Sequence, residues 1–292
     1  MHVLLIHQAF VSPDDAGGTR HYELARRFVD GGHQFSIVAS DLSYLSGKKC
    51  AANELVQDFD GVKVQRAWTY SALHRSFVWR IVSFLSFMVS SVWTALKVKN
   101  VDLVIGTSPP IFQAVSAWVI SVIKWRPFLL EIRDLWPEFA VDMGVLKNPV
   151  LIWMARRLER FLYARANHML VNSPAYRDYL IGLGIPAEKI SFIANGVDPD
   201  MFHVQKTAGG LRDEFQLHQK YLVTYAGAMG MANNLEVVLE AATLLTDVPD
   251  VHFLMVGDGK DRQKLEELAK SMNVKNVTFT GSRPKSQMPE IL

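Results

Sequence analysis

Short apolar runs alternate with longer helical patterns along this chain, and that alternation constrains its fold more than any other feature. The first run, at residues 3–6, is apolar at every position, which is typical of a parallel sheet covered on both faces. Strand-like runs occur at residues 3–7, 35–40, 62–68, 101–107, 128–132, 169–172 and 191–194. Helical patterns lie between them at residues 19–29, 77–98, 111–124, 149–166 and 175–183. The alternation predicts a doubly wound α/β domain.

A polar, glycine-containing stretch at residues 205–210 interrupts this pattern and is suited to a hinge. The pattern then restarts, with strand-like runs at 222–226, 253–256 and 277–280 and helical patterns at 235–245 and 261–272. Three strands make a thin sheet. We therefore expect one domain over residues 1–200 and a second, incomplete domain over residues 201–292. The last residues begin a new helical pattern, so we expect a fragment or a truncated product.

Charge and cysteine content exclude several classes of protein. The chain has 31 Lys and Arg against 29 Asp and Glu, a net charge of +2, which gives no reason to expect nucleic-acid binding. Its single cysteine, Cys50, excludes an internal disulfide and a cysteine-built zinc site. The first residues lack the cationic leader of a secretory signal. We expect a protein of a reducing compartment, the cytoplasm.

The loop before the first helical pattern contains two adjacent glycines. Gly17 and Gly18 let backbone approach a ligand closely. Thr19 is placed to cap a helix whose free amides favour an anion. A tight turn with a helix cap explains the same residues, so both interpretations stay open.

A second loop places charged residues directly after a buried strand-like run. Asp134 and Glu138 are candidates for orienting a hydroxyl or stabilising positive charge; an ion-paired surface loop is the alternative. If Trp136 and its aromatic neighbour desolvate Glu138, the pKa of Glu138 rises and it becomes the better general base. Asp134, beside Arg133, is then expected to stay ionised.

Two glycine loops in the second half have the layout of a phosphate cradle, in which a strand, a loop and a helix N-terminus follow one another. They span residues 227–234 and 256–259. Neither has the Gly-x-Gly-x-x-Gly dinucleotide spacing, and the chain contains no P-loop motif, which disfavours an NAD enzyme or a P-loop ATPase.

A further turn follows the strand-like run at 191–194. Asn195-Gly196 is a strong turn signal. Asp198 and Asp200 have the spacing by which some sugar transferases hold a divalent metal. Because Pro199 lies between them beside the hinge, a turn is the better interpretation, and we expect no metal site.

In this order, these loops resemble glycosyltransferase family 4, whose GT-B fold has two facing Rossmann-like domains. Each match is weak alone; together they span nearly the whole chain. The matching segments are Gly17-Gly18 and residues 195–198, 227–230, 256–259 and 279–281. Residues 133–138 are similar to a branch of bacterial enzymes that build O-antigen or capsule on a lipid carrier.

The resemblance implies a retaining transfer from a UDP-linked sugar, without metal or cofactor, to a lipid-linked or saccharide acceptor held by the first domain. Stabilising the leaving diphosphate is then the main catalytic contribution. The donor-binding residues that it implies are Gly17, Gly18, Arg20, Asn195, Gly196, Gly227, Met229, Gly230, Gly257, Asp258, Gly259, Arg283 and Pro284. The candidate catalytic residues are Asp134, Glu138 and Arg133.

The chain departs from the family's pattern in three places. The loop at 227–234 lacks the Arg and Lys of many members, so Arg20, Lys260, Arg283 or helix dipoles would carry that charge. Arg133 stands where many members have His. No Glu is followed by another Glu eight positions on, so the family's Glu-x7-Glu donor motif is absent.

The most hydrophobic stretch, at residues 76–96, contains Arg80 as its only charge. Its small and polar residues recur about every 3.6 positions, which predicts a helix. The remaining apolar arc is about 220°, wider than the ~100° of a helix packed on a sheet. A core helix, a helix in the membrane interface and a spanning helix remain possible interpretations. We expect membrane or acceptor contact, at the inner face of the plasma membrane, through Phe77, Trp79, Phe84, Phe87 and Trp93.

Three functions remain as hypotheses. The leading one is a glycosyltransferase of bacterial surface polysaccharide synthesis. The second is a sugar-nucleotide epimerase on the same two-domain architecture, which would need no lipid acceptor. The third is a non-catalytic remnant or binding module that docks to a membrane or partner, and the absent Glu pair favours it.

Overall fold

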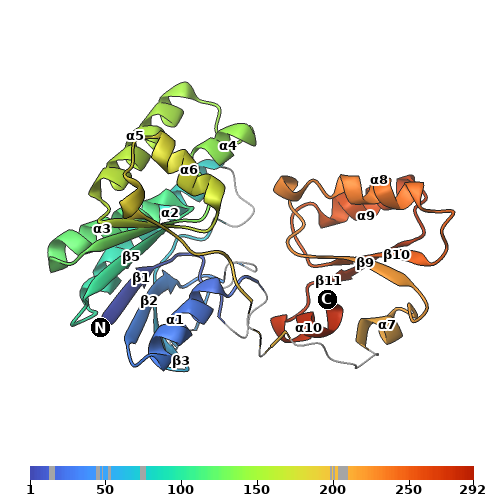
Figure 1. Cartoon of the computed structure of the whole chain (residues 1–292), viewed down its shortest axis with the longest axis horizontal. Helices are drawn as coiled ribbons and strands as arrows, with labels where there is room; N and C mark the ends of the chain where they lie inside the picture. The colour runs from blue at the N-terminus through green and yellow to red at the C-terminus, as the bar shows by residue number, and fades with distance from the viewer. Residues whose placement is uncertain are drawn as a thin grey trace. The chain divides into compact units, whose positions relative to one another are not determined.

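A computed structural model of the 292-residue chain describes residues 1–12, 17–43, 47, 49–51, 54–72, 77–197, 199, 201–202 and 210–292. It divides the chain into two compact units (Figure 1). The first unit comprises Met1–Ser12 and Thr19–Gly196, and the second contains Val197–Leu292. Each has an α/β architecture with its own sheet, in agreement with the predicted fold class.

The first unit is built on an eight-stranded sheet in the order β3-β4-β2-β1-β5-β6-β7-β8. All neighbouring strands are parallel except the pair β3 and β4. The order reverses between β1 and β5, the kind of point where open α/β sheets bind ligands. The strands are β1 (His2–Ile6), β2 (Gln34–Ser40), β3 (Val56–Phe59), β4 (Val62–Ala67), β5 (Leu103–Ser108), β6 (Phe128–Ile132), β7 (His168–Val171) and β8 (Ile190–Phe192).

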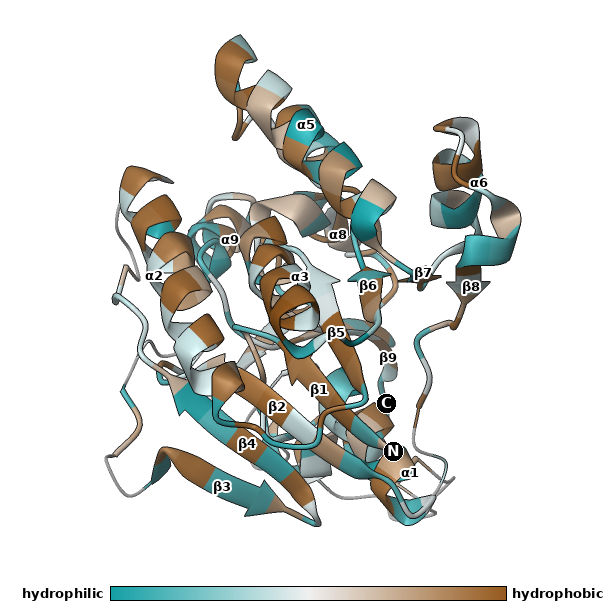
Figure 2. Cartoon of the chain, turned by 90° about the vertical axis from the view of Figure 1, so that its left-hand side faces the viewer, coloured by the Kyte–Doolittle hydropathy of each residue, from teal (hydrophilic) through white to brown (hydrophobic). Residues whose placement is uncertain are grey.

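Helices cover both faces of this sheet, because alternate residues of a strand point to opposite sides. On one face, Val3 and Leu5 of β1 pack against α1 (Arg20–Asp30). On the other face, Leu4 and Ile6 belong to a core completed by several helices (Figure 2). These helices are α2 (Phe77–Leu96), α3 (Ile111–Lys124), α5 (Pro149–Arg165) and α6 (Pro174–Gly182). The short α4 (Glu138–Asp142) and the 3-10 turn η2 (Ala187–Lys189) complete the unit.

The edge strand β3 is absent from our sequence prediction. It forms an antiparallel hairpin with β4 around Asp60 and Gly61, which have φ angles of 52° and 86°. The Gly61 amide donates to Asp58 Oδ1 at 2.7 Å. An Asp-Gly pair is a strong hairpin signal, but the polar sequence of β3 does not have the apolar run by which the other strands are found.

The second unit has a three-stranded parallel sheet in the order β11-β10-β9. Met255 of β10 packs with α8 and α9 on one face, whereas Leu254 and Val256 pack with α7 and α10 on the other. The strands are β9 (Tyr221–Ala226), β10 (Val251–Val256) and β11 (Val277–Gly281). The helices are α7 (Gly210–Glu214), α8 (Glu236–Leu244), α9 (Arg262–Ser271) and α10 (Met288–Ile291), with 3-10 turns η3 (Met231–Asn233) and η4 (Lys285–Gln287).

Within the described residues, α2 contains one stretch, Val78–Leu96, that is long and apolar enough to cross a membrane by length and composition alone. The helix packs against α3, and the strands before and after it, β4 and β5, share one sheet. Its Phe87 is completely buried and its Phe84 stacks on Phe112 at 6.0 Å between ring centroids.

The prediction that Phe87 faces a membrane or acceptor is therefore wrong, because its side chain is completely buried. Phe84 is half-buried beside Phe112 of α3, and its contact with a membrane or acceptor stays a prediction. The side chain of Phe77 lies outside what the structure describes. Trp79 and Trp93 are exposed, at 44% and 68% of their surface.

Candidate functional site

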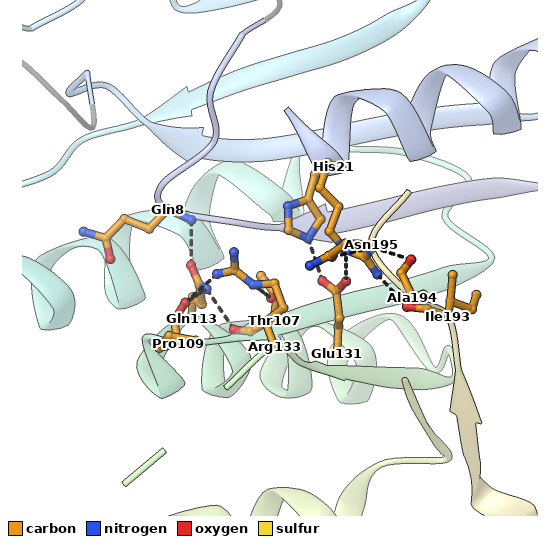
Figure 3. Close-up of polar contacts among 11 residues, drawn as sticks. Gln8, His21, Thr107, Pro109, Gln113, Glu131, Arg133, Ile193, Ala194 and Asn195 are labelled. Carbon is orange, nitrogen blue, oxygen red and sulfur yellow. Dashed lines mark hydrogen bonds and ion pairs between the residues drawn. The ribbon is translucent and has the colours of Figure 1, made fainter. Parts of the chain in front are cut away.

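Polar side chains gather at the carboxyl edge of the first unit's sheet (Figure 3). His7 directly follows β1, Thr107 lies at the end of β5, and Glu131 and Arg133 lie at the end of β6. Because β1, β5 and β6 are adjacent and parallel, their carboxyl ends meet at one edge. This edge also carries the reversal of strand order described above.

The Glu131 carboxylate is the centre of this group, and its side chain is only 3% exposed. Arg20 Nε donates to Oε1 at 3.1 Å, and His21 Nε2 lies 2.5 Å from Oε2. Burial alone would raise the pKa of Glu131, but the hydrogen bond and charge of His21, together with Arg133 and Arg20, lower it to about 2. Glu131 is therefore a fixed negative charge and not a proton acceptor.

Arg20, which we expected to bind the donor, contacts the chain itself. Its Nη1 donates to the Ala194 carbonyl at 3.2 Å and to Asn195 Oδ1 at 3.0 Å. Its Nη2 reaches the Ile193 carbonyl at 3.4 Å. The predicted donor residues Arg20 and Asn195 are thus brought together, but as partners of each other.

Arg133 is anchored to the end of β5. Its Nε donates to Thr107 Oγ1 at 2.8 Å and its Nη2 to the Pro109 carbonyl at 2.8 Å. Gln113 supports the same segment, because its Nε2 donates to the Thr107 carbonyl at 2.8 Å and its Oε1 accepts from the Gln8 amide at 2.6 Å. Arg133 therefore orders the loops after β5 and β6 and adds positive charge to the edge.

His7, directly after β1 at this edge, is buried, with 4% of its surface exposed. The centre of its ring lies 4.2 Å from that of the His21 ring, with the two planes tilted by 59°. Neither ring nitrogen of His7 has a hydrogen-bond partner among the described residues. Burial, and then the charges of His21 and Arg133, hold the pKa of His7 well below its usual value. His7 is therefore a neutral imidazole.

The two candidate carboxylates lie in environments opposite to those we expected. Arg156 donates from Nε and Nη2 to the two carboxylate oxygens of Glu138, at 2.7 and 2.8 Å. This pairing lowers the pKa of Glu138. Asp134 accepts a long hydrogen bond of 3.5 Å from the Tyr176 hydroxyl, and burial raises the pKa of Asp134. The prediction that Glu138 has the raised pKa is therefore wrong, because it did not include Arg156 from α5.

One buried carboxyl was not predicted from the sequence. Glu159 of α5 is 3% exposed and its Oε1 accepts from the Tyr163 hydroxyl at 2.6 Å. Burial raises the pKa of Glu159 to about 7, and Glu138 adds to that shift. The only feature of the sequence that points to Glu159 is the tyrosine one helical turn later. That spacing also occurs on exposed helices, so it does not predict a buried carboxyl.

The glycine loops after β9 and β10 fit closely against each other in the second unit. A Cβ on Gly257 would lie 1.9 Å from the Gly227 carbonyl oxygen, and one on Gly259 would lie 2.3 Å from the Met229 carbonyl oxygen. Gly257 also has a φ of 136°. These glycines are therefore required by the packing of one loop on the other, before any ligand is considered.

In the loop after β9, some backbone amides donate hydrogen bonds within the protein and others do not. The Gly227 and Met229 amides donate to the Val256 and Asp258 carbonyls, each at 2.9 Å. Within the described residues, the amides of Ala228 and Gly230 have no acceptor. The Met229 side chain is completely buried in the core below α8 and α9, and its backbone amide and carbonyl are both hydrogen-bonded within the protein.

Two other predicted donor residues, Asp258 and Arg283, are placed by side-chain contacts. Asp258 Oδ1 accepts from the Gly259 amide at 2.7 Å. Arg283 Nη2 donates to Glu214 Oε1 at 2.6 Å, which turns the guanidinium toward α7. Arg283 also lines a hollow of about 150 Å³ that includes Glu214 and Glu290. Pro284 immediately precedes η4.

The remaining predicted positions are less constrained. Gly17 has a φ of 132°, in a region that favours glycine, whereas a Cβ on Gly18 or Gly196 would meet nothing within 4 Å. Asp198 and Asp200 lie outside the described residues. In the part of the chain that the structure describes, no group of three or more His, Cys, Asp or Glu side chains could hold a metal ion.

Two family models match the chain. Residues 16–196 match a glycosyl transferase 4-like domain, and residues 211–292 match the glycosyl transferases group 1. The boundary between the two matches falls close to the division between the two structural units.

The chain is also similar to a protein of Escherichia coli K12 named as the colanic acid biosynthesis glycosyl transferase WcaI. The two are 24% identical over 301 aligned residues, which cover 99% of this chain and 74% of WcaI.

Among solved structures, the Thermosynechococcus elongatus sucrose-phosphate synthase has a TM-score of 0.74 at 16% identity, covering 99% of this chain and 72% of that one. Anabaena HepE in complex with UDP and glucose has a TM-score of 0.69 at 17% identity, covering 99% and 71%. These likenesses show a shared fold. Since the first family model alone matches more than half of the residues, the chain belongs to the glycosyl transferases that combine a 4-like domain with a group 1 domain.

Proposed function

We propose that this chain transfers a sugar from a UDP-sugar to a saccharide or lipid-linked saccharide during synthesis of a bacterial surface polysaccharide. The observation that carries the proposal is the match to WcaI over 99% of the chain, because WcaI is named for colanic acid biosynthesis. The UDP in the HepE complex, which has a similar fold, supports the choice of donor.

The second unit has suitable groups for a diphosphate. As the sugar leaves, negative charge builds on the phosphate oxygen that held it, and groups already aimed at that oxygen stabilise the transition state. The amides of Ala228 and Gly230 are available for this purpose at the loop before η3. Lys260 is exposed directly after Gly259 and adds a positive charge. We propose a retaining transfer without a metal, with these groups holding the leaving UDP.

Asp134 is our candidate for the group that accepts or orients the acceptor hydroxyl. It follows β6 at the carboxyl edge, and its raised pKa makes it a stronger base than an ordinary aspartate. Glu138 is held by Arg156 and is assigned the task of fixing α4 against α5. Arg133 is assigned the task of ordering the neighbouring loops.

We further propose that the outer face of α2 and the start of α5 rest on the inner face of the plasma membrane. Val89 and Trp93 of α2 and Trp153 of α5 are 56%, 68% and 63% exposed. Arg157 and Arg160 of α5 are exposed as well. Apolar rings beside basic side chains are the combination that binds an anionic membrane interface.

The test of the proposed activity is a transfer assay with radiolabelled UDP-sugars and bacterial membrane lipids as acceptor. Radioactivity in the lipid or polysaccharide fraction, with release of UDP, is the expected result. Interconversion of one UDP-sugar into another without an acceptor would instead identify an epimerase. Absence of both products, together with no stabilisation of the chain by millimolar UDP, would identify a non-catalytic module.

A further inference from the structure

The guanidinium group of Arg20 donates hydrogen bonds from all three of its nitrogens. Its Nε donates to Glu131, its Nη1 to Ala194 and Asn195, and its Nη2 to Ile193. A guanidinium has five N–H donors in a rigid fork, and these four contacts use most of them. Little capacity is left for a phosphate.

These contacts join two points of the chain that are far apart in sequence. Arg20 is the first residue of α1 and directly follows Gly17, Gly18 and Thr19. Its partners Ala194 and Asn195 are 174 and 175 residues away, just before Gly196, where the first unit ends. The side chain of Arg20 therefore joins the start of α1, just after Gly17 and Gly18, to residues 193–195 at the end of the first unit.

The anchor of this arrangement is rigid. The Arg20 side chain is 17% exposed and Glu131 is 3% exposed, and His21 binds the other carboxylate oxygen. Two successive residues of α1 thus hold one buried carboxylate. Lysine would reproduce the charge of Arg20 but not its planar fork, which reaches three oxygen acceptors outside Glu131.

We propose that Arg20 is a positioning residue of the transferase and not a ligand of the nucleotide sugar. By clamping residues 193–195 against the start of α1, it sets the direction in which the chain leaves the first unit. This inference rests on the proposed function, because it assigns a role within that reaction.

The first experiment compares Arg20→Ala, Arg20→Lys and the matched control Arg27→Ala, an exposed arginine on the same helix. We measure UDP affinity by calorimetry, kcat with saturating UDP-sugar, and hydrogen exchange of residues 193–196. For Arg20→Ala we expect faster exchange in that segment and a kcat lower by about 10²-fold, the size of effect of a small misplacement. UDP affinity should stay within about threefold of the wild type.

Arg20→Lys separates a positioning role from a merely structural one. We expect it to recover most of the melting temperature, because the charge beside Glu131 is restored, but not kcat, because the fork is lost. Arg27→Ala should match the wild type in all three measurements. Recovery of kcat in parallel with the melting temperature would overturn the positioning role.

Arg20→Ala leaves the buried Glu131 with one fewer positive partner, so this variant can fail to fold. A second variant covers that case. Asn195→Ala removes one acceptor from the exposed end of the clamp and should produce the same changes in exchange and kcat, at a smaller size. Unchanged exchange at 193–196 in this variant, or a tenfold loss of UDP affinity with normal kcat in Arg20→Ala, would overturn the proposal. A wild-type chain that binds UDP but transfers no sugar would instead refute the proposed function, and with it any role in the reaction.

Discussion

Arg156 holds both carboxylate oxygens of Glu138, with distances of 2.7 Å from Nε to Oε1 and 2.8 Å from Nη2 to Oε2. This fork-to-fork pair joins the first residue of α4 to the middle of α5. A bidentate charged pair favours the ionised carboxylate, so Glu138 is a weak base. Asp134, four residues earlier, has the raised pKa instead.

The two carboxylates should therefore differ in their effect on turnover. We expect Asp134→Asn to lower kcat by about 10²–10⁴-fold, the usual range for loss of a general base. Glu138→Gln should lower it by less than about tenfold, because it only loosens a contact between α4 and α5. Both are measured as initial rates of UDP release at saturating donor.

A pH profile provides the control for this assignment. Protonation of Asp134 should remove activity as the pH falls, at a higher pH than for an ordinary aspartate, because burial raises its pKa. The acidic limb should disappear in Asp134→Asn and persist in Glu138→Gln. A larger loss of kcat in Glu138→Gln than in Asp134→Asn would contradict the assignment.

Glu159 should make the stability of the first unit depend on pH. The folded chain keeps the proton of Glu159 up to a pKa of about 7, whereas the ordinary value is 4.5. The folded state therefore binds more protons between these values, and stability falls as the pH rises through them, by about 3 kcal/mol at most. In Glu159→Gln the difference in unfolding free energy between pH 5 and pH 8 should shrink by up to that amount.

Urea unfolding at both pH values measures this difference, with Glu240→Gln, an exposed glutamate of α8, as the control. The control should keep the wild-type dependence on pH. The glutamine in Glu159→Gln retains an oxygen that accepts from Tyr163, so their hydrogen bond persists. Equal dependence on pH in wild type and Glu159→Gln would show that this carboxyl does not titrate as its burial implies.

Gly257→Ala should destabilise the second unit. The new Cβ would lie 1.9 Å from the Gly227 carbonyl oxygen at a residue whose φ is 136°. Overpacking and backbone strain each cost about 1–3 kcal/mol. Gly230→Ala is the matched control, because its Cβ would meet nothing within 4 Å. Hydrogen exchange should show faster opening of β9 and β10 in the first variant and wild-type rates in the second.

Membrane binding should depend on the outward residues of α2. We expect the double variant Val89→Ser, Trp93→Ser to lose sedimentation with anionic liposomes while keeping the wild-type melting temperature, because both side chains are exposed. Leu244→Ser, on an equally apolar exposed position of α8, should still sediment. Failure of the wild type to bind such liposomes would count against the membrane proposal.

Phe87→Ser tests the inward face of the same helix. Phe87 is completely buried, and loss of a buried phenylalanine side chain costs about 3–5 kcal/mol. We expect a large fall in melting temperature, without specific loss of liposome binding in whatever fraction stays folded. A variant of normal stability would show that Phe87 is not part of the core.

The sequence predicted those elements whose signal is local. Apolar runs located β6 at residues 128–132, the same residues that the structure gives, because burial on both faces makes every position of the strand apolar except Glu131. The periodicity of α2 predicted its helix but not its inward face. Ser86 and Thr94 donate their hydroxyl hydrogens to carbonyls of the helix itself, so small polar residues there do not mark the side facing water.

The contacts that define the candidate site are not local and could not be predicted from spacing. Glu131 is 111 residues from Arg20 and 110 from His21, and the three meet only after α1 packs beside the sheet. Arg156 reaches Glu138 from another helix. The sequence identified Asp134 and Glu138 as a pair of interest, but their relative basicity is decided by a partner that no motif contains.

The close fit of the two glycine loops has a consequence for engineering donor preference. Gly257 and Gly259 approach the backbone of Gly227 and Met229 so closely that neither loop can change shape alone. Grafting one loop from a relative would bring a backbone that does not match its neighbour. If these loops hold the donor as proposed, exchange of sugar specificity should therefore succeed only when both loops are transplanted together, and libraries that randomise one of them should yield mostly chains with an unstable second unit.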